Sequence, residues 1–333
     1  MSDYIYSSAR VRALESSFLG ADVMTRLAES ADLRAAYAML AEFGVDLKKD
    51  EASGTILREA TLSARLSAAY EEVRQLTEGE LSPAFSMWRY PYDCNNIKAA
   101  IKCFFREISC RGMLFEFGTV SAYDVEQMPA KRDFSALPVR MAQAAEAAMA
   151  QYSKTKNPQE IDFLIDRACY ADMLAAAEES GVLFAVSLIR SKIDLINLVT
   201  CIRMMRMQCG EAGRALLFEA LLEGGTLDRA FFTSYYELGE RALWEHLAYT
   251  DYKTMAEEIS SREPRLTEVE RIADRIWMEK IKEARFVPYG AEVLIGFLLG
   301  VEAEVRNLRV VLAGKEAGLS AETILERIRD GYV

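Results

Sequence analysis

The sequence has one histidine, five asparagines, seven prolines and no apolar segment of membrane-spanning length. His246 has no second histidine with which to bind a metal ion, and the six scattered cysteines form no CxxC pair, so we expect no metal site. The cysteines are interpreted as reduced thiols. The longest apolar run, residues 293–301, is about half of the ~20 residues that a transmembrane helix needs. We therefore expect no transmembrane helix.

Catalytic motifs are also missing from the sequence. There is no GxGxxG, and Gly314-Lys315 is followed by Glu316 where a phosphate-binding loop requires Ser or Thr. Paired acids such as Glu178-Glu179 are adjacent, so they point to different faces of a helix. No cofactor and no catalytic residue is predicted. A cysteine nucleophile with His246 as its base stays open as the basis of an enzyme hypothesis.

The net charge of −11 argues against nucleic acid or an anionic membrane as the main partner. The first ten residues lack the apolar segment of a signal peptide, which favours a cytoplasmic protein. Apolar residues make up 51% of the chain, which is ample core material. Because prolines are few and apolar residues recur at helical spacing, the fold class predicted is all-α.

What the sequence does contain is a motif that occurs three times, an acid three residues before an asparagine that Ile or Leu follows. Asparagine is a poor helix former, yet three of the five stand in this position, at intervals of 101 and 110 residues. The copies are Asp93/Asn96, Asp194/Asn197 and Glu304/Asn307. Repetition at this period predicts three similar helical-bundle repeats, at 1–128, 129–236 and 237–333.

Further features recur around the motif. A large aromatic residue, expected in the core, precedes each asparagine by 26 to 30 residues (Tyr70, Tyr170 and Trp277). A glycine and then a hydroxyl residue follow, and we expect them to open another helix (Gly118-Thr119, Gly225-Thr226 and Gly318-Leu319-Ser320). These features support the three-repeat interpretation.

Helical periodicity places long helices around residues 55–76, 93–108, 137–152, 160–180, 189–207 and 291–312, with a last helix over 321–329. A non-regular segment is expected between Ser82-Pro83 and Tyr90-Pro91. Ile97, Ile101, Phe104 and Ile108 are expected to share one apolar face. The 189–207 helix is apolar almost all round, which predicts burial on every side. No strand is predicted.

The repeated asparagines Asn96, Asn197 and Asn307 allow two interpretations. In the structural one, each buried amide bonds a neighbouring helix or loop, because an unpaired buried amide costs ~1–3 kcal/mol. In the functional one, the three helices line a shared surface that meets a partner. We favour the structural role for the asparagines and assign the surface to the charges beside them.

The residues then reveal a resemblance. The segment from Phe286-Val287-Pro288-Tyr289-Gly290 through Glu304–Arg309 to Leu319 resembles the C subunit of the archaeal and bacterial V-type (A-type) ATPase, whose eukaryotic counterpart is the d subunit of the membrane sector. The opening Tyr6–Glu15 and the region Tyr90–Lys102 resemble this family too. The chain departs from a strict repeat where Lys102 and Arg203 correspond to Ala313.

The resemblance implies a helical funnel of three similar units around a pseudo-threefold axis. It also implies a non-catalytic protein that couples the D and F subunits of the central shaft to the proteolipid rotor ring, attached through that ring to the inner face of the cell membrane. Shaft-facing candidates are Arg89, Asp93, Asp194, Arg203, Glu304 and Arg309. Ring-facing candidates, from the segments that follow the motif helices, are Phe115, Phe117, Leu222 and Leu227.

Two other classes stay open. A general α-helical scaffold or adaptor would share the repeats, although solenoids usually repeat every ~20–50 residues. A helical thiol hydrolase would depend on His246.

Overall fold

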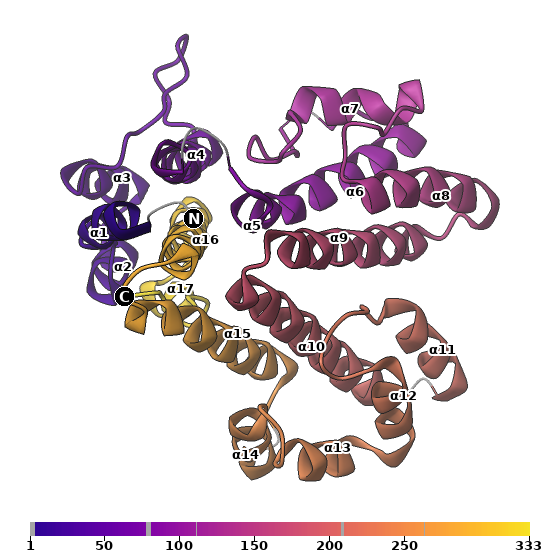
Figure 1. The fold of residues 1–333 in the computed structure, drawn as a ribbon. Helices are drawn as coiled ribbons and strands as arrows, with labels where there is room; N and C mark the ends of the chain where they lie inside the picture. Colours follow the sequence, from indigo (N-terminus) through magenta and orange to yellow (C-terminus); the bar gives the residue numbers. More distant parts are fainter. Residues whose placement is uncertain (1–3, 78–80, 111, 208–209, 263) are drawn as a thin grey trace. The chain divides into compact units, whose positions relative to one another are not determined.

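A computed structural model describes residues 4–77, 81–110, 112–207, 210–262 and 264–333. Its regular structure is helical throughout these residues, as predicted (Figure 1). The described part of the chain has no strand, and Lys49 and Ile56 form one isolated antiparallel bridge. No described helix combines the length and the apolar character needed to cross a bilayer.

The chain forms two compact units. Unit 1 contains residues 1–88, 115–117 and 280–333, and unit 2 contains residues 89–114 and 118–279. The first and last parts of the chain therefore belong to one unit, although they are far apart in sequence. The boundaries proposed from the sequence, at 128/129 and 236/237, stay predictions.

Unit 1 is built around its last long helix, α16 (Ala291–Glu316). This helix packs against α4, α1 and α2, and most of its residues are buried. The other elements are α1 (Tyr4–Glu15), α2 (Ala21–Glu29), α3 (Leu33–Glu42), α4 (Arg58–Leu76), α5 (Pro83–Ser86), η2 (Glu283–Phe286) and α17 (Ala321–Leu325).

Unit 2 is built around α9 (Pro158–Ser180), which packs against α8, α10 and α6. The other elements are α6 (Tyr90–Arg106), α7 (Ala122–Lys131), α8 (Val139–Thr155), α10 (Leu183–Arg206), α11 (Gly210–Ala220), α12 (Arg229–Leu238), α13 (Glu240–Leu247) and α14 (Lys253–Arg262). The turn η1 (Met87–Arg89) and α15 (Leu266–Lys282) run from one unit into the other.

Short polar side chains and glycines set many helix ends. Asp32, Ser121, Asn157, Asp228 and Ser320 each accept a hydrogen bond from a backbone N–H in the first turn that follows. Gly181 ends α9 in the left-handed conformation (φ 69°), which glycine adopts at no steric cost. These caps fix where the long helices begin and stop.

Three local predictions were wrong. The segment from Ser82 to Tyr90 is helical, because Pro83 and Pro91 lie in first turns, where a missing N–H costs nothing. The hydroxyl residues Thr119 and Thr226 do not open the next helices, whose N-caps are Ser121 and Asp228. The last helix ends at Leu325 and does not reach residue 329.

Burial along the motif helices also differs from the predictions. Ile97 and Ile101 are buried, but Phe104, in the last turn of α6, and Ile108, beyond the end of the helix at Arg106, are exposed. The α10 helix is not buried on every side, since Arg203 is exposed and several apolar positions beside it are half-exposed. These apolar side chains form a surface that composition alone had placed in the core.

Candidate partner-binding surface

The three motif helices α6, α10 and α16 have the same burial pattern around their asparagines. Counting each asparagine as position 0, positions −4 to −2, 0, +1, +4, +5 and +7 are buried in all three copies. Positions −5, −1, +2, +3 and +6 are partly or fully exposed in all three. We call positions −1, +2, +3 and +6 the outer stripe. The local environment is therefore repeated, each copy within its own unit.

The asparagine side chain joins the helix to a following loop through two hydrogen bonds. Asn197 Nδ2 donates to the Leu222 carbonyl, and the Leu222 N–H donates to Asn197 Oδ1, both at 2.9 Å. Asn307 makes the same pair with Arg329, at 2.7 and 3.0 Å. Asn96 is 1% exposed. A buried amide that satisfies a loop backbone in this way serves structure.

The acid of the motif binds the loop that leads into another helix. Asp93 Oδ2 accepts from Thr119 N (2.9 Å) and Thr119 Oγ1 (2.6 Å), and Oδ1 accepts from Val120 N (3.1 Å). Burial raises the pKa of Asp93, while the Thr119 and Val120 donors and the charge of Arg89 oppose that rise. The next residue, Ser121, is the N-cap of α7. The carboxylate thus fixes the start of α7 against α6.

Asp194 repeats this arrangement and adds a phenol. It accepts from Thr226 N and Leu227 N, both at 3.0 Å, and from the Thr226 hydroxyl. Tyr252 also donates to it at 2.8 Å, and burial together with the charge of Asp194 raises the pKa of this tyrosine. Asp228, next along the chain, caps α12.

Two glycines make this contact possible. A Cβ on Gly118 would lie 2.1 Å from Asp93 Oδ1, and a Cβ on Gly225 would lie 2.1 Å from Asp194 Oδ1. No side chain fits at that distance, so the carboxylate can reach the loop only if the residue there is glycine. We call a motif helix together with the loop that its acid binds an acid–asparagine module.

The third module takes its loop from the beginning of the chain. Glu304 Oε2 accepts from Leu19 N at 2.6 Å, and Oε1 pairs with Arg65. Leu19 precedes Gly20, the N-cap of α2, just as Val120 and Leu227 precede the N-caps of α7 and α12. In Gly318-Leu319-Ser320, the third glycine and hydroxyl pair, Gly318 follows α16 with φ 68° and Ser320 caps α17, as predicted. The carboxylate of Glu304 binds Leu19 instead of this segment.

Basic residues of the outer stripes form ion pairs with a neighbouring helix. Lys98 and Lys102 pair with Asp166 and Asp162 of α9, Arg203 pairs with Glu270 of α15, and Arg309 pairs with Glu59 of α4. In the sequence, α4, α9 and α15 precede the motif helices α6, α10 and α16, respectively. Their ion pairs, however, join them to α16, α6 and α10. The pairs are partly exposed, so they orient side chains more than they stabilise the fold.

The structure places the shaft-facing candidates in two groups. Asp93, Asp194 and Glu304 are buried, with 0%, 0% and 4% of their surface exposed, because their carboxylates satisfy loop backbones. They therefore present no surface to a partner. Arg89 is half-exposed and donates to the Gly118 carbonyl. Arg203 and Arg309 lie on outer stripes.

The ring-facing candidates divide in the same way. Phe117 and Leu222 are buried, with Phe117 in edge-to-face contact with Tyr70 and the Leu222 backbone bonded to Asn197. Leu227 is half-exposed. Phe115 is also half-exposed, and the Arg309 guanidinium lies 5.4 Å from the centre of its ring. Phe115 thus contacts a shaft-facing candidate, and its ring-facing role stays a prediction.

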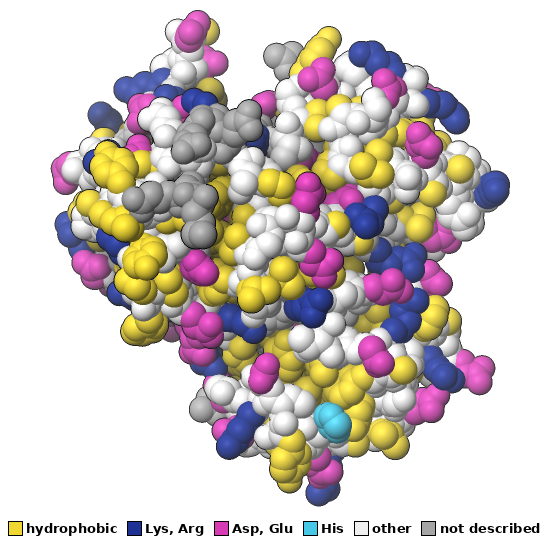
Figure 2. Space-filling view, viewed as in Figure 1, with side chains coloured by type: hydrophobic (Ala, Val, Ile, Leu, Met, Phe, Trp, Pro, Cys, Tyr) yellow, Lys and Arg dark blue, Asp and Glu magenta, His cyan; other side chains and the backbone are white. Residues whose placement is uncertain are grey.

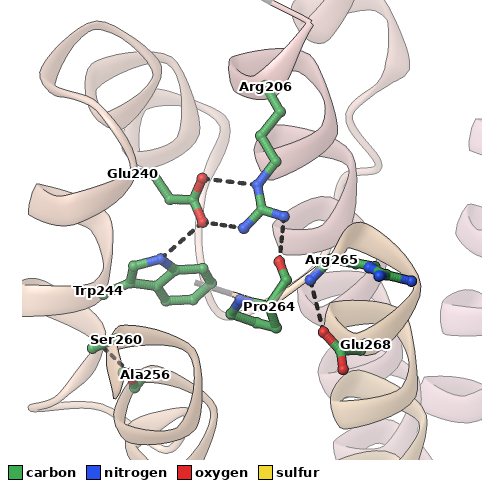
Figure 3. A network of polar contacts seen from close by, with 8 residues as sticks. All are labelled: Arg206, Glu240, Trp244, Ala256, Ser260, Pro264, Arg265 and Glu268. Atoms are coloured by element: carbon green, nitrogen blue, oxygen red, sulfur yellow. Dashed lines mark hydrogen bonds and ion pairs between the residues drawn. The ribbon is translucent and has the colours of Figure 1, made fainter. Parts of the chain in front are cut away.

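Sequence reasoning missed the polar network at the end of α10 (Figure 3). Arg206 makes a bidentate pair with Glu240 (2.6 and 3.0 Å) and donates to the Pro264 carbonyl at 2.6 Å. The indole N–H of Trp244 donates to the same carboxylate at 3.2 Å. The network borders a pocket of about 690 Å³ on α10, α13 and α14. An arginine in the last turn of a helix before a loop was the available signal.

His246 lies at the surface of α13, where it is the cyan side chain in Figure 2. Its ring is 5.4 Å from that of Phe231 and 5.2 Å from that of Tyr235. Five cysteines are described, all buried and free, while Cys209 lies outside the described residues. No group of three or more His, Cys, Asp or Glu residues in the described ranges could hold a metal ion. The His246 ring is edge-on to Phe231 and tilted relative to Tyr235.

Together, the buried acids, the paired asparagines and the partly exposed stripes define a class: an all-helical protein with a repeated module whose outer faces are partly exposed. The particular family follows from comparison with known proteins. The model of the ATP synthase (C/AC39) subunit family matches residues 7–327, and the chain belongs to this family.

Relatives match along most of the chain. The C subunit of the A-type ATP synthase of Methanosarcina mazei is 24% identical over 98% of this chain and 93% of that protein. The protein of the same name from Thermococcus onnurineus is also 24% identical, over 98% and 90%. The C subunit of the V-type sodium ATPase of Enterococcus hirae is 26% identical over 52% of each chain.

Proposed function

We propose that this protein is the non-catalytic central-stalk subunit of a rotary V/A-type ATPase, coupling the central shaft to the membrane rotor ring during ion transport or ATP synthesis. Family membership supports the complex. The observation that carries the coupling role is the identical burial pattern of α6, α10 and α16. Helices with the same buried and the same exposed positions suit a socket of three similar faces around a pseudo-threefold axis.

The outer stripes are the proposed contact surface for the D and F subunits of the shaft. Arg203 and Arg309 stand on them, whereas the buried acids among the shaft-facing candidates hold the modules rigid. Each stripe combines apolar or small residues with basic ones, of which Lys98, Lys102, Arg203 and Arg309 form ion pairs. Such surfaces resemble protein–protein interfaces, which are more polar than cores. Rigid faces with modest polar contacts suit a joint that transmits torque without chemistry.

For the ring we keep Leu227, which follows the second motif helix and stays half-exposed. The proteolipids of the ring would provide the attachment to the inner face of the cell membrane. No second function is proposed, because His246 contacts the aromatic rings of Phe231 and Tyr235 and no observation favours a catalytic role for it.

The test is binding of the purified D–F shaft pair to the full chain, compared with a triple charge reversal on the stripes, Lys102→Glu, Arg203→Glu and Arg309→Glu. Each reversal breaks one partly exposed ion pair, so the fold should survive at about 1 kcal/mol or less per site. We expect binding of the shaft to fall at least about tenfold, because three interface contacts become repulsive.

The matched control is another triple reversal, Arg214→Glu, Arg241→Glu and Lys253→Glu. These residues also form exposed ion pairs but lie off the stripes. The control should bind the shaft as the unmodified protein does. Equal binding by both triple variants would rule out the stripes as the shaft surface, and circular dichroism would establish that both are folded.

A further inference from the structure

A pocket of about 360 Å³ lies along the outer stripe of α16. Its lining shows two kinds of surface. The floor is apolar and made largely of small residues. The rim is basic. We call the apolar or small lining residues with exposed surface the floor (Val310, Ala313, Ala317 and Leu319) and the basic lining residues the rim (Arg306, Arg309 and Arg327); the buried Gly314 and Ile324 also line the pocket. The volume is in the range of sites that bind a few side chains or a small ligand.

The charge of the pocket is opposite to that of the chain. Three lining side chains are guanidinium groups and none is a carboxylate, whereas the whole chain has a net charge of −11. Glu59 Oε2 lies 2.9 Å from Arg309 Nε, and the Phe115 ring lies 5.4 Å from its guanidinium, so Arg309 is held in place. Arg327 is exposed at the rim. Planar guanidinium groups recognise carboxylates through paired N–H donors.

The small and apolar residues of the floor restrict which ligands fit the pocket. Ala313 of α16 and Ala317, the C-cap of that helix, are one turn apart and partly or fully exposed, whereas Gly314 is buried with Ile324 packed against it, where a Cβ would lie 2.6 Å from Ile324. Small exposed residues let another backbone approach closely, and the half-exposed Val310 and Leu319 supply apolar contact. A free phosphate ion would use the rim and gain nothing from this floor. A peptide with carboxylates on either side of an apolar side chain would use both.

The three outer stripes differ in how they could receive such a peptide. The stripe of α6 has Lys98 and Lys102, both paired with aspartates of α9. The stripe of α10 has Arg203, paired with Glu270. The stripe of α16 has two arginines, Arg306 and Arg309, and Arg327 of the C-terminal segment joins them in one pocket. The third module is thus chemically distinct from the two that it otherwise resembles.

We infer that this pocket binds an acidic peptide segment with an apolar residue between its carboxylates, supplied by the central shaft, and that this contact fixes which of the three similar faces the shaft engages. The inference rests on the proposed function, because the pocket occupies one of the stripes assigned to the shaft. The pocket would give the shaft a defined orientation in a socket whose modules are otherwise alike.

The first test uses the full chain and a short fluorescent synthetic peptide of Asp, Glu and Leu, with binding followed by anisotropy. Arg306→Gln with Arg327→Gln should weaken binding at least about tenfold, since each lost charge-assisted bond matters in a partly buried site. Arg327→Gln alone should also weaken binding, and its exposed position leaves folding unaffected. Arg241→Gln, an exposed residue on α13, is the matched control and should change nothing.

The probes separate the possible ligands. A peptide with Lys in place of its acidic residues should not bind. Equal affinity for the basic peptide, or displacement of the acidic peptide by inorganic phosphate at comparable concentrations, would overturn the assignment to an acidic peptide.

The second test uses the D–F shaft pair, so that the two proposals fail differently. If the unmodified chain does not bind the shaft, the proposed function fails and the inference fails with it, whatever the synthetic peptide does. If the unmodified chain binds the shaft and the double glutamine variant binds equally well, the proposed function stands and the orienting pocket is ruled out. The inference expects shaft binding to weaken in the double variant and to persist in Arg241→Gln.

Discussion

The second and third acid–asparagine modules use different acids, Asp194 and Glu304, to bind the backbone of a loop that leads into another helix. In the α10 module, Asp194 reaches a loop that follows it by about thirty residues and passes beside Gly225. In the α16 module, Glu304 reaches Leu19, 285 residues away. Ser17 stands three residues before the N-cap of α2, where Gly225 stands three residues before that of α12. The side chain that is one methylene longer coincides with a loop that has Ser17 at the position of Gly225.

This difference shows which parts of the repeat are constrained. The asparagine and its two bonds to a loop backbone are the same in both modules. The acid, the loop residue and the position of the loop in the chain all differ. What is common is a buried carboxylate that satisfies a backbone N–H just before a helix N-cap. The repeat is therefore a repeat of hydrogen bonding more than of sequence.

The largest effect should come from adding a methyl group beside the aspartate. Gly225→Ala places a Cβ 2.1 Å from Asp194 Oδ1, so the carboxylate must leave its buried donors. We expect the free energy of unfolding to fall by about 3–4 kcal/mol in urea titrations. Ser17→Ala, the matched change in the third module, removes only an exposed hydroxyl and should cost under about 1 kcal/mol. Similar losses for the two variants would show that the loops are not equivalent.

Removing the charge of each acid gives the next comparison. In Asp194→Asn, the new NH₂ group must face a backbone N–H of Thr226 or Leu227, which cannot act as an acceptor. We expect a loss of about 3 kcal/mol. Glu304→Gln keeps an oxygen for Leu19, and Arg65 is partly exposed and can turn to solvent, so the loss should be about 1 kcal/mol.

Hydrogen exchange of the α12 and α2 segments would localise these two effects. An equal increase in exchange at both segments would contradict the distinction between the modules.

The asparagines should behave alike where the acids do not. Asn197→Ala and Asn307→Ala each leave a loop N–H and carbonyl without a partner, which we expect to cost about 2 kcal/mol in both cases. Asn95→Ala, at an exposed stripe position, is the control and should have no measurable effect. If the losses of unfolding free energy for Asn197→Ala and Asn307→Ala differed by more than about 1 kcal/mol, the two asparagine–loop hydrogen-bond pairs would not be equivalent in energy.

The smallest effect at neutral pH belongs to Tyr332, which packs on Gly296, Gly300 and Phe18 in unit 1. Burial raises its pKa to about 12, from about 10 in the unfolded chain. The folded state therefore retains the proton more tightly, so this contribution is complete below pH ~10 and is lost as pH rises through ~12.

At pH ~12 the loss should be about 2 kcal/mol relative to Tyr332→Phe, which has no ionisable group. Unfolding titrations from neutral to alkaline pH would measure this. A difference between the two proteins that does not change with pH would contradict it.

Much of the fold was predictable from local pattern. Helical periodicity placed the long helices, and the scarcity of asparagine exposed the motif, because a poor helix former is kept at mid-helix only where its amide is used. The buried acids could not be placed in the same way. A charged residue is expected at the surface unless backbone N–H donors surround it. The donors of Asp194, the N–H groups of Thr226 and Leu227, are recognised only in the structure, where their loop is folded onto α10.

The loop that Glu304 binds could not be predicted from the local sequence pattern, for a different reason. Ser17-Phe18-Leu19 lacks the Gly-Thr pair that marked the other two loops, and it comes before its helix in the chain instead of after it. Gly318-Leu319-Ser320 has the predicted glycine and helix-capping serine, but it is not the loop that Glu304 binds. Gly20, the N-cap of α2, was the signal available for a helix start there. A sequence alignment of the three copies that continued from the C-terminal end of the chain to its N-terminal end would have matched residues 17–19 with the other two loops.

The pairing of α16 with α1, α2 and α4 has a consequence for how the protein is made. A ribosome releases the partners of α16 more than two hundred residues before it releases α16 itself. Unit 2 can fold while synthesis continues, whereas the apolar faces of α2 and α4 must wait. Long sequence separation slows folding and leaves such faces open to aggregation. During translation, the earliest residues to emerge are thus among the last to become native.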